Sequence, residues 1–425
     1  MTSQVVDPLA RTGDPTARTP VQPEEEQPSS QPTFLKAAFA HPMFDYHLVV
    51  VTSAVLVCLG LMMVISSSSV IAAAEMDDPY YFGKRQIIFA IIGIAGAWVL
   101  SMLPEKFMRA MSWPVLILAM LLLILTFSPL GVDVAGNRNW LGLGPTWARF
   151  QPSEFAKLAI IVWGANDLAR RQKRLIDMRQ WLMYIVACFT LVALVVLQKD
   201  QGTAMVMGAM VIVVLVAAGA PWRMLAALGG VAVVGVVGLI AIQPYRMRRI
   251  WAFLNPNEDL LGLNLQAQRG IYALASGGWF GEGLGASRQK WGLLAEAHTD
   301  YIFAIIGEEL GLLGTLTVIA LFVALAYAGI RIASRSACAF SRLVAVGVVA
   351  WFTVQAFVNI AVAIRLVPVM GVTLPMISYG GSSLMANLFA VGLLAGCARR
   401  EPEAQQLLKD RRNKPRMRSI VREQA

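Results

Sequence analysis

The chain has 425 residues, of which 57% are hydrophobic and only 15% charged. This composition excludes a soluble protein of this size and indicates a polytopic membrane protein. The formal net charge of +10 does not indicate nucleic-acid binding, because much of the basic charge lies in short segments between hydrophobic stretches, where the positive-inside rule accounts for it.

Residues 1–45 are rich in Pro, Gln, Thr, Ser and Glu, which predicts a disordered cytoplasmic tail without a signal peptide. Windows of about 20 apolar residues then predict membrane helices. The expected fold is an all-α polytopic membrane protein with a membrane domain over 46–398, a large loop over 243–300 between helices seven and eight, and a basic cytoplasmic tail over 399–425. The ten predicted helices cover 47–74, 86–103, 113–130, 153–169, 181–198, 203–220, 223–242, 301–331, 342–365 and 382–398.

The distribution of Lys and Arg predicts the orientation of these helices. Basic residues crowd the connections around 170–179 and 331–342 and the tail after residue 398, whereas the alternate short loops carry few. Basic loops stay in the cytoplasm, so both termini are predicted to be cytoplasmic and the loop over 243–300 extracytoplasmic. Most of the unusual polar motifs then fall on the outer face.

The most unusual stretch is EAHTDYIFAIIGEELG at 296–311, where a polar loop becomes an apolar helix. Asp300 is either an N-terminal cap of that helix or a catalytic carboxylate, and His298 is either an ordinary loop histidine or part of the same site. Glu308 and Glu309 are adjacent in an apolar helix and point about 100° apart. At least one of them is predicted to make a structural contact between helices.

A second polar pair lies in FQPSEFAK at 150–157. With Ser153 as the helix cap, Glu154 falls in the first turn and Lys157 lies on the same face three residues later. The two side chains are therefore predicted to pair. They are either a first-turn acid with a snorkelling lysine or a polar site that lines an internal cavity.

Two further motifs are candidate anion sites. In PMISYGGSS at 375–383, Ser378, Gly380 and Ser382 open the last predicted helix, where exposed backbone N–H groups either bind an anion or form a plain turn and cap. The basic run that contains Arg246 and Arg249 begins the long loop. It either contacts anionic lipid headgroups or holds a phosphate group.

The predicted location of these motifs narrows the reaction. An enzyme on the outer face has no ready supply of ATP or nucleotide sugars, and the sequence contains no P-loop, zinc motif or nucleophile elbow. The four cysteines lack metal-ligand spacing, so no metal site is predicted. A polyprenyl-pyrophosphate sugar is already activated, and one carboxylate acting as general base would then suffice. These residues allow that reaction without singling it out.

Four motifs together resemble the SEDS (shape, elongation, division, sporulation) family, whose members polymerise lipid II into glycan strands. They are EAHTDYIFAIIGEELG, SGGWFGEGLG at 276–285, FQPSEFAK and PMISYGGSS, and the resemblance runs from the first predicted helix to the tenth. The ending IGEELG and the long N-terminal extension favour the division branch of the family over the elongation branch.

The resemblance implies that Asp300 is the general base on the acceptor hydroxyl, with undecaprenyl pyrophosphate as leaving group. It implies that Glu154 and Lys157 are a polar pair in the central cavity. We add Arg138, Arg246, Arg249, His298, Ser378, Gly380 and Ser382 as candidates for substrate or pyrophosphate binding. The implied partners are lipid II, the nascent glycan strand, a class B penicillin-binding transpeptidase of the FtsI type, and FtsQ, FtsL and FtsB at the division septum. No cofactor is predicted, and assistance by a divalent cation stays open.

Two departures from the family pattern stand out. The usual Gln-Pro-Asp-Leu-Gly-Thr appears as Gln198-Lys199-Asp200-Gln201-Gly202-Thr203, and Ala295 replaces the proline before Glu296. Two other functions fit a polytopic protein with intramembrane charges: a flippase that moves lipid II, and a non-catalytic divisome scaffold.

Overall fold

This computed structural model describes residues 41–134, 136–142, 149–171, 179–242, 244–255 and 263–413. Each of the ten predicted windows coincides with a helix, so the predicted all-α polytopic class is confirmed. Most of the predicted N-terminal tail lies outside the described residues, and its last residues already begin the first helix. The ten helices are α2 (Phe44–Met76), α3 (Tyr81–Met102), α4 (Glu105–Leu125), α5 (Pro152–Arg171), α6 (Arg179–Leu197), α7 (Gln201–Ala217), α8 (Trp222–Ile242), α11 (Ile302–Arg335), α12 (Ala339–Ala363) and α13 (Gly381–Arg399).

Seven helices in the described part of the chain are long and apolar enough to cross a membrane: α2, α3, α4, α6, α11, α12 and α13. The apolar parts of α7 and α8 are shorter. Helix α5 contains Glu154, Lys157 and Asp167 and is buried on nearly all sides from Pro152 to Leu168. A helix buried all round belongs to the interior of a bundle. The count of ten spans therefore stays a prediction.

Three segments predicted as connections contain regular structure. The loop over 131–152 forms a small antiparallel sheet of β1 (Gly131–Val134), β2 (Asn137–Gly142) and β3 (Arg149–Phe150), with Val132 opposite Trp140 and Leu141 opposite Phe150. The long loop contains α9 (Pro244–Leu254) and α10 (Leu263–Ser276), and α14 (Pro402–Asn413) lies in the basic tail. These elements are short or polar, so hydropathy windows do not detect them.

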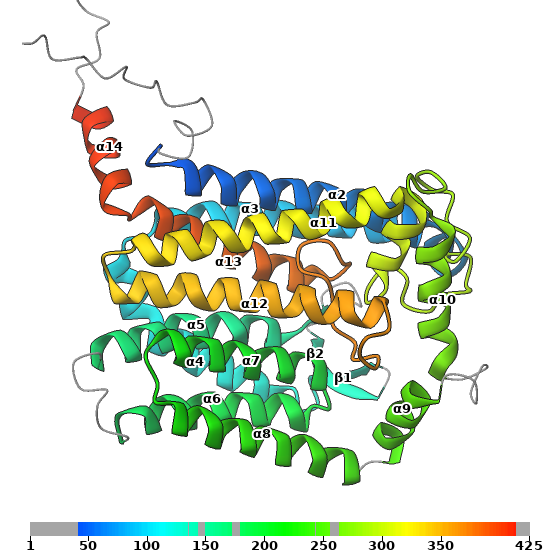
Figure 1. Cartoon of the computed structure of the whole chain (residues 1–425), viewed down its shortest axis with the longest axis horizontal. Coiled ribbons are helices and arrows are strands. Elements are labelled where there is room, and N and C mark those ends of the chain that lie inside the picture. Colours follow the sequence, from blue (N-terminus) through cyan, green and yellow to red (C-terminus); the bar gives the residue numbers. More distant parts are fainter. Residues whose placement is uncertain are drawn as a thin grey trace, which may run out of the picture. The chain divides into compact units, whose positions relative to one another are not determined.

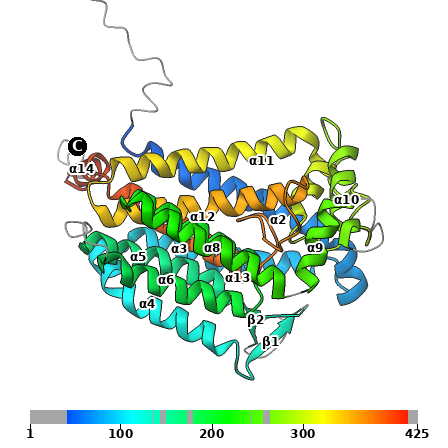
Figure 2. The same cartoon turned by 60° about the horizontal axis from the view of Figure 1, so that its bottom comes forward.

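Figures 1 and 2 show the long helices lying side by side, with α9, α10 and the β1–β2 hairpin at one end of the bundle and α14 at the other. Helix α11 packs against α2 and α12, and α12 packs against α5 and α7. Both α12 and α13 are buried along most of their length. The polar motifs of the sequence gather at the α10 end of this bundle.

Helix α11 breaks at Gly311, whose φ of 69° and ψ of −165° are not helical. Leu312 N and Leu313 N donate instead to Gly278 O (2.9 Å) and Trp279 O (3.2 Å). In return, Glu308 O accepts a hydrogen bond from Glu282 N (2.9 Å), and Glu309 O accepts one from Gly283 N (3.1 Å). Residues 277–283, the glycine clasp, therefore complete the hydrogen bonds of the broken helix. A Cβ on Gly281 (φ +81°) would lie 2.2 Å from the backbone of α11, which explains the glycine.

Both glutamates ahead of the break bind protein groups. Glu308 accepts hydrogen bonds from Ser287 Oγ (2.5 Å) and from the backbone N–H of Arg288 (2.9 Å). Glu309 accepts hydrogen bonds from Ser66 Oγ of α2 (2.7 Å) and pairs with Lys290 (3.2 Å). The prediction of a structural contact is thus confirmed for Glu309, which joins two helices, while Glu308 holds the loop.

Candidate active site

Asp300 lies in a turn that immediately precedes α11. The turn closes because Thr299 N and Tyr301 N both donate to Glu296 O, at 3.2 and 3.1 Å. Glu296 has a φ of 56°, in the left-handed region. Helix α11 begins at Ile302 and has no side-chain cap, so the capping interpretation of Asp300 is wrong. The carboxylate is half-buried and its Oδ2 faces Gly371, where a built Cβ would lie 3.5 Å away.

The surroundings of Asp300 shift its protonation into the neutral range. Burial, followed by the negative charges of Glu296 and Asp200, raises the pKa of Asp300 to about 7, while the Arg249 guanidinium opposes the shift. Proton transfer is most efficient when the pKa of the base lies near the working pH. Asp300 therefore has the protonation behaviour of a general base.

His298 is packed between two aromatic rings rather than exposed in a loop. Its ring centroid lies 5.1 Å from that of Phe82 in α3 and 5.6 Å from that of Tyr379. Burial lowers the pKa of His298, because the charged imidazolium loses hydration there. The side chain is therefore neutral at pH 7 and packs beside the Asp300 turn.

The backbone of this turn is held from two sides. Asn359 of α12 donates from Nδ2 to both Asp300 O (2.8 Å) and Val372 O (2.7 Å). From the segment before α13, Ser378 Oγ donates to Thr299 O (2.6 Å) and Tyr379 N donates to His298 O (3.0 Å). The motifs at 296–301 and 375–383 are therefore one assembly, and Asn359 fixes it to the interior of the bundle.

Glu154 and Lys157 form the predicted ion pair, with an N–O distance of 2.8 Å and side chains 5% and 1% exposed. The lysine does not snorkel, since its Nζ also donates to Gln355 of α12 (2.9 Å) and lies 4.5 Å from the ring centroid of Trp351. Glu154 accepts a hydrogen bond from Ser383 (3.1 Å). The predicted cap at Ser153 is wrong, because α5 already begins at Pro152, a residue well suited to the first helical position.

Helix α12 connects this ion pair with the Asp300 turn. Gln355 accepts a hydrogen bond from Lys157 Nζ and donates one to Thr373 O (2.9 Å). Asn359, one turn further on, donates hydrogen bonds to the backbone carbonyls of Val372 and Asp300. Asparagine and glutamine one helical turn apart lie on the same face. The ion pair and Asp300 are thus linked through two amide side chains and the 372–373 backbone.

The turn between α6 and α7 joins the same assembly through Asp200. Its carboxylate caps α7 by accepting from Thr203 N (3.1 Å) and also accepts from Asn139 and Gln151, both at 3.0 Å. Lys199 has a φ of 66°. Proline is locked near −65° and could not adopt this conformation. A proline at position 199, as in the family's usual sequence, would therefore not fit this turn, in which Asp200 caps α7.

The basic candidates separate in the structure. Arg138 is exposed on β2 and donates to Ser128 O (2.9 Å), at the start of its own hairpin. Arg249 of α9 donates to Val369 O (3.0 Å), in the segment that continues to Gly371 beside Asp300. The side chain of Arg246 lies outside the described residues. Of the two candidates whose side chains the structure describes, Arg249 is the one that lies near Asp300.

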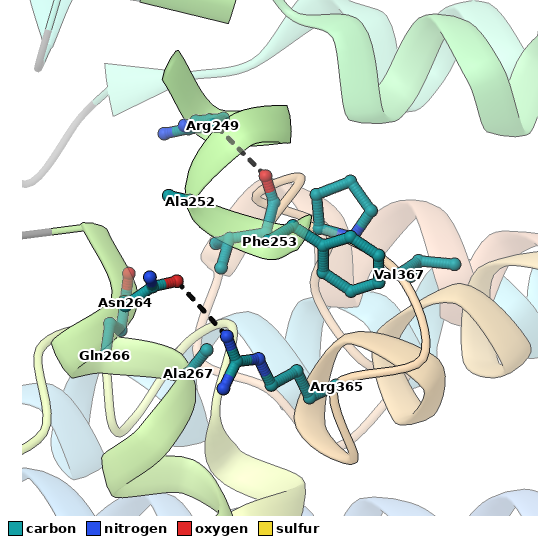
Figure 3. Close-up of a pocket in the computed structure, with 10 residues that line it drawn as sticks. Arg249, Ala252, Phe253, Asn264, Gln266, Ala267, Arg365 and Val367 are labelled. Carbon is teal, nitrogen blue, oxygen red and sulfur yellow. Dashed lines mark hydrogen bonds between the residues drawn. The ribbon is translucent and has the colours of Figure 1, made fainter. Parts of the chain in front are cut away.

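A cavity between α9, α10 and the segment after α12 lies next to this arginine (Figure 3). Arg249 lines it from α9, and Arg365 lines it from the end of α12, where its Nη2 donates to Asn264 (3.3 Å). Two guanidinium groups on one cavity favour an anionic ligand. Arg365 was not among the candidate site residues that the sequence predicted.

The residues that open α13 face protein groups. Gly380 N donates to Gln86 of α3 (3.3 Å), and Ser382 Oγ accepts a hydrogen bond from Gln151 N (3.3 Å). Ser378 Oγ also accepts from Leu374 N (2.7 Å). These contacts favour the interpretation of Ser378, Gly380 and Ser382 as a plain turn over direct anion binding, although α13 has no side-chain cap.

Comparison with known proteins places this geometry in a family. The family model FTSW_RODA_SPOVE, described as "Cell cycle protein", matches residues 46–403. The chain belongs to this family. It is 40% identical over 353 residues to a probable peptidoglycan glycosyltransferase FtsW of Trichlorobacter lovleyi, a match that covers 82% of this chain and 92% of the relative.

The chain is also similar to a further curated protein and to solved structures. The chain is 40% identical over 354 residues to stage V sporulation protein E of Bacillus subtilis, covering 83% of this chain and 96% of that protein. It is also similar to the crystal structure of Thermus thermophilus RodA, with a TM-score of 0.61, 28% identity and coverage of 83% and 96%. A peptidoglycan synthase complex described as coordinating polymerization and crosslinking matches with a TM-score of 0.68, 28% identity and coverage of 83% and 97%. The chain is a multi-pass membrane protein.

Proposed function

We propose that this protein is a peptidoglycan glycosyltransferase of the septal cell wall, which polymerises lipid II into glycan strands. The observation that carries the proposal is the Asp300 carboxylate, half-buried, with a pKa of about 7, in a turn held by two other motifs of the sequence. The names of the relatives supply the reaction class. The Asp300 carboxylate supplies the base that this reaction requires.

In the proposed reaction, the Asp300 carboxylate accepts the proton of the 4-hydroxyl of the acceptor lipid II. The hydroxyl oxygen attacks the anomeric carbon of the growing chain and forms the new glycosidic bond. The bond from that carbon to the pyrophosphate oxygen breaks, and undecaprenyl pyrophosphate leaves as a stabilised anion. Attack from the opposite face converts the α linkage to β. One base suffices, because this leaving group needs no general acid.

Arg249 and Arg365 are the residues we propose for the pyrophosphate. Both line the cavity next to the segment that passes Asp300, and guanidinium groups bind phosphate oxygens through charge-assisted, bidentate hydrogen bonds. Arg249 also acts electrostatically on Asp300 itself. We propose that Glu154 and Lys157 act from a distance, by fixing the amide face of α12 that holds the Asp300 turn.

We further propose that the active site faces the extracytoplasmic side, that both termini are cytoplasmic and that the protein works at the division septum. A class B penicillin-binding transpeptidase is the proposed partner, together with FtsQ, FtsL and FtsB. The similarity to a peptidoglycan synthase complex supports the transpeptidase. The predominance of FtsW names among the relatives supports the septal role.

The direct test is polymerisation of purified lipid II by the purified protein with its transpeptidase, in the absence of a membrane gradient. Asp300→Asn keeps the shape and the backbone contacts of the turn, so it should fold normally and make no polymer. Movement of lipid II without polymer, unaffected by this substitution, would instead identify a flippase. Normal cell division with Asp300→Ala would identify a scaffold.

A further inference from the structure

The glycine clasp carries a patch of exposed large apolar side chains. Trp279 is 67% exposed and Phe280 81%, and Leu284 and Trp291, on the loop that follows, are 56% and 69% exposed. Large exposed apolar surface marks an interaction site on proteins. None of these four side chains belongs to the proposed active site.

The patch continues a lipid-facing face of the neighbouring helix. Beyond the break in α11, one side of the helix is apolar and exposed through Leu312, Leu313, Leu316, Ile319 and Val323. The hydrogen bond from Leu313 N to Trp279 O joins the clasp to the beginning of that face. In a multi-pass membrane protein, an exposed apolar face of a spanning helix contacts acyl chains.

The lengths of α11 and α2 support a position of the clasp at a membrane boundary. Arg331 near the far end of α11 pairs with Asp45 at the start of α2, at 3.2 Å, and we take this ion pair as the opposite boundary for both helices. About 20 helical residues cross the hydrocarbon core. Twenty residues counted back from Arg331 along α11 end at Leu312, and twenty counted from Asp45 along α2 end at Val64, two residues before Ser66. Ser66 donates to Glu309, directly beside the clasp, so α2 and α11 are aligned at this end of the bundle as well.

The backbone of the clasp is suited to this position. Non-helical backbone at a membrane boundary needs internal partners for its N–H and C=O groups, because lipid offers none. The clasp exchanges backbone hydrogen bonds with both sides of the Gly311 break. The Lys290–Glu309 ion pair next to it is almost completely buried, with side chains 4% and 0% exposed. Polar groups are thus turned inward, and aromatic side chains are turned outward.

We propose that the glycine clasp is a lipid anchor, in which Trp279 and Phe280 insert into the boundary between headgroups and acyl chains on the Asp300 side of the membrane. Tryptophan and phenylalanine rings favour this zone. The partner is the phospholipid bilayer itself. The anchor would fix the height of the α11 break, and therefore of the turn that precedes α11, relative to the membrane surface.

The first test measures depth with spin labels in nanodiscs that contain this chain alone. In a background in which the four cysteines are replaced by serine, a nitroxide is attached at Phe280→Cys, at Val323→Cys within the lipid-facing face, or at Gln406→Cys on the polar helix α14. We expect the label at 280 to collide more with oxygen than with a water-soluble nickel chelate, at a ratio between those of the two controls. A ratio equal to that at 406 would overturn the proposal.

A second test avoids the cysteine-free background. The fluorescence that Trp279 contributes is the difference between the wild-type protein and Trp279→Phe, each in bilayers of ordinary phospholipid or of phospholipid brominated near the headgroup end of the chains. We expect brominated lipid to quench this difference strongly. An unquenched difference would show that Trp279 lies in water, and protection that arises only after adding the transpeptidase would show that the patch binds a protein instead.

Discussion

Asp300 has to lose its own proton before it can accept one from a substrate. Because its pKa is raised to about 7, the base form predominates above pH 7 and the protonated form below. We predict that the polymerisation rate falls about tenfold for each pH unit below this midpoint. The measurement is the initial rate of lipid II polymerisation between pH 5 and 9, corrected with a stability control at each pH.

The charged neighbours of Asp300 predict the direction in which substitutions shift the pH profile. Glu296 raises the pKa of Asp300 and Arg249 lowers it. Glu296→Gln should therefore shift the midpoint of the pH profile to lower pH, and Arg249→Gln should shift it to higher pH. Profiles that coincide with the wild type in both variants would mean that another group controls the rate.

The Glu154–Lys157 pair allows a stability prediction at the same scale. Lys157→Met leaves Glu154 buried without its cation, and breaking a buried pair in this way costs about 3–5 kcal/mol. The double variant Glu154→Gln/Lys157→Met removes both charges and should recover much of the loss. Thermal unfolding in detergent measures both. A double variant less stable than Lys157→Met would contradict the explanation.

At the scale of elements, the clasp and the break in α11 make a prediction about two glycines. Gly281 and Gly278 both have positive φ, 81° and 53°, but only at Gly281 would a Cβ meet the α11 backbone, at 2.2 Å, whereas Gly278 has open space. Gly278→Ala should cost about 1 kcal/mol for its backbone conformation alone. Gly281→Ala should cost clearly more, by thermal unfolding. Equal losses would show that the clasp does not contact α11 this closely.

How much of these elements could be predicted depends on the range of the interactions. Hydropathy alone predicted every long helix, and the three-residue spacing in α5 predicted the Glu154–Lys157 pair. The clasp could not be predicted, because its partners exist only once α11 breaks at Gly311. Asn359 and Asp300 are 59 residues apart in the chain. A local sign that this helix contacts the site was its pair of amide side chains, Gln355 and Asn359, inside apolar sequence.

At the scale of the whole molecule, the proposed chemistry requires Asp300 to lie outside the cytoplasm. We predict that Glu296→Cys, in the same turn, reacts with a membrane-impermeant maleimide in intact cells. Gln406→Cys on α14 should react only after lysis, because α14 lies at the opposite end of the bundle. The wild-type chain measures labelling of its own cysteines. The reverse pattern would place the turn in the cytoplasm, away from the proposed substrate.

The sequence analysis predicted that most of the polar motifs lie on the outer face, and the structure gathers most of them at one end of the bundle. What composition and spacing could not distinguish was which polar residues hold the fold and which face a substrate. Ser378, for example, donates a hydrogen bond to Thr299 in the turn before α11, and Gly380 N donates one to Gln86 of α3. Arg365 was not predicted as a site residue because the cavity it lines is formed with α9 and α10, which hydropathy does not detect.

The backbone exchange between the clasp and α11 also restricts how a lipid-linked sugar can travel. The clasp and α11 are joined by backbone hydrogen bonds on both sides of Gly311. A polyprenyl tail could pass between them only by breaking these hydrogen bonds. The flank formed by α8 is different, since most of its described residues are exposed and a Cβ built on any of its glycines would meet no atom within 4 Å. We therefore expect substrate to arrive and the spent carrier to depart past α8, leaving the clasped flank shut throughout turnover.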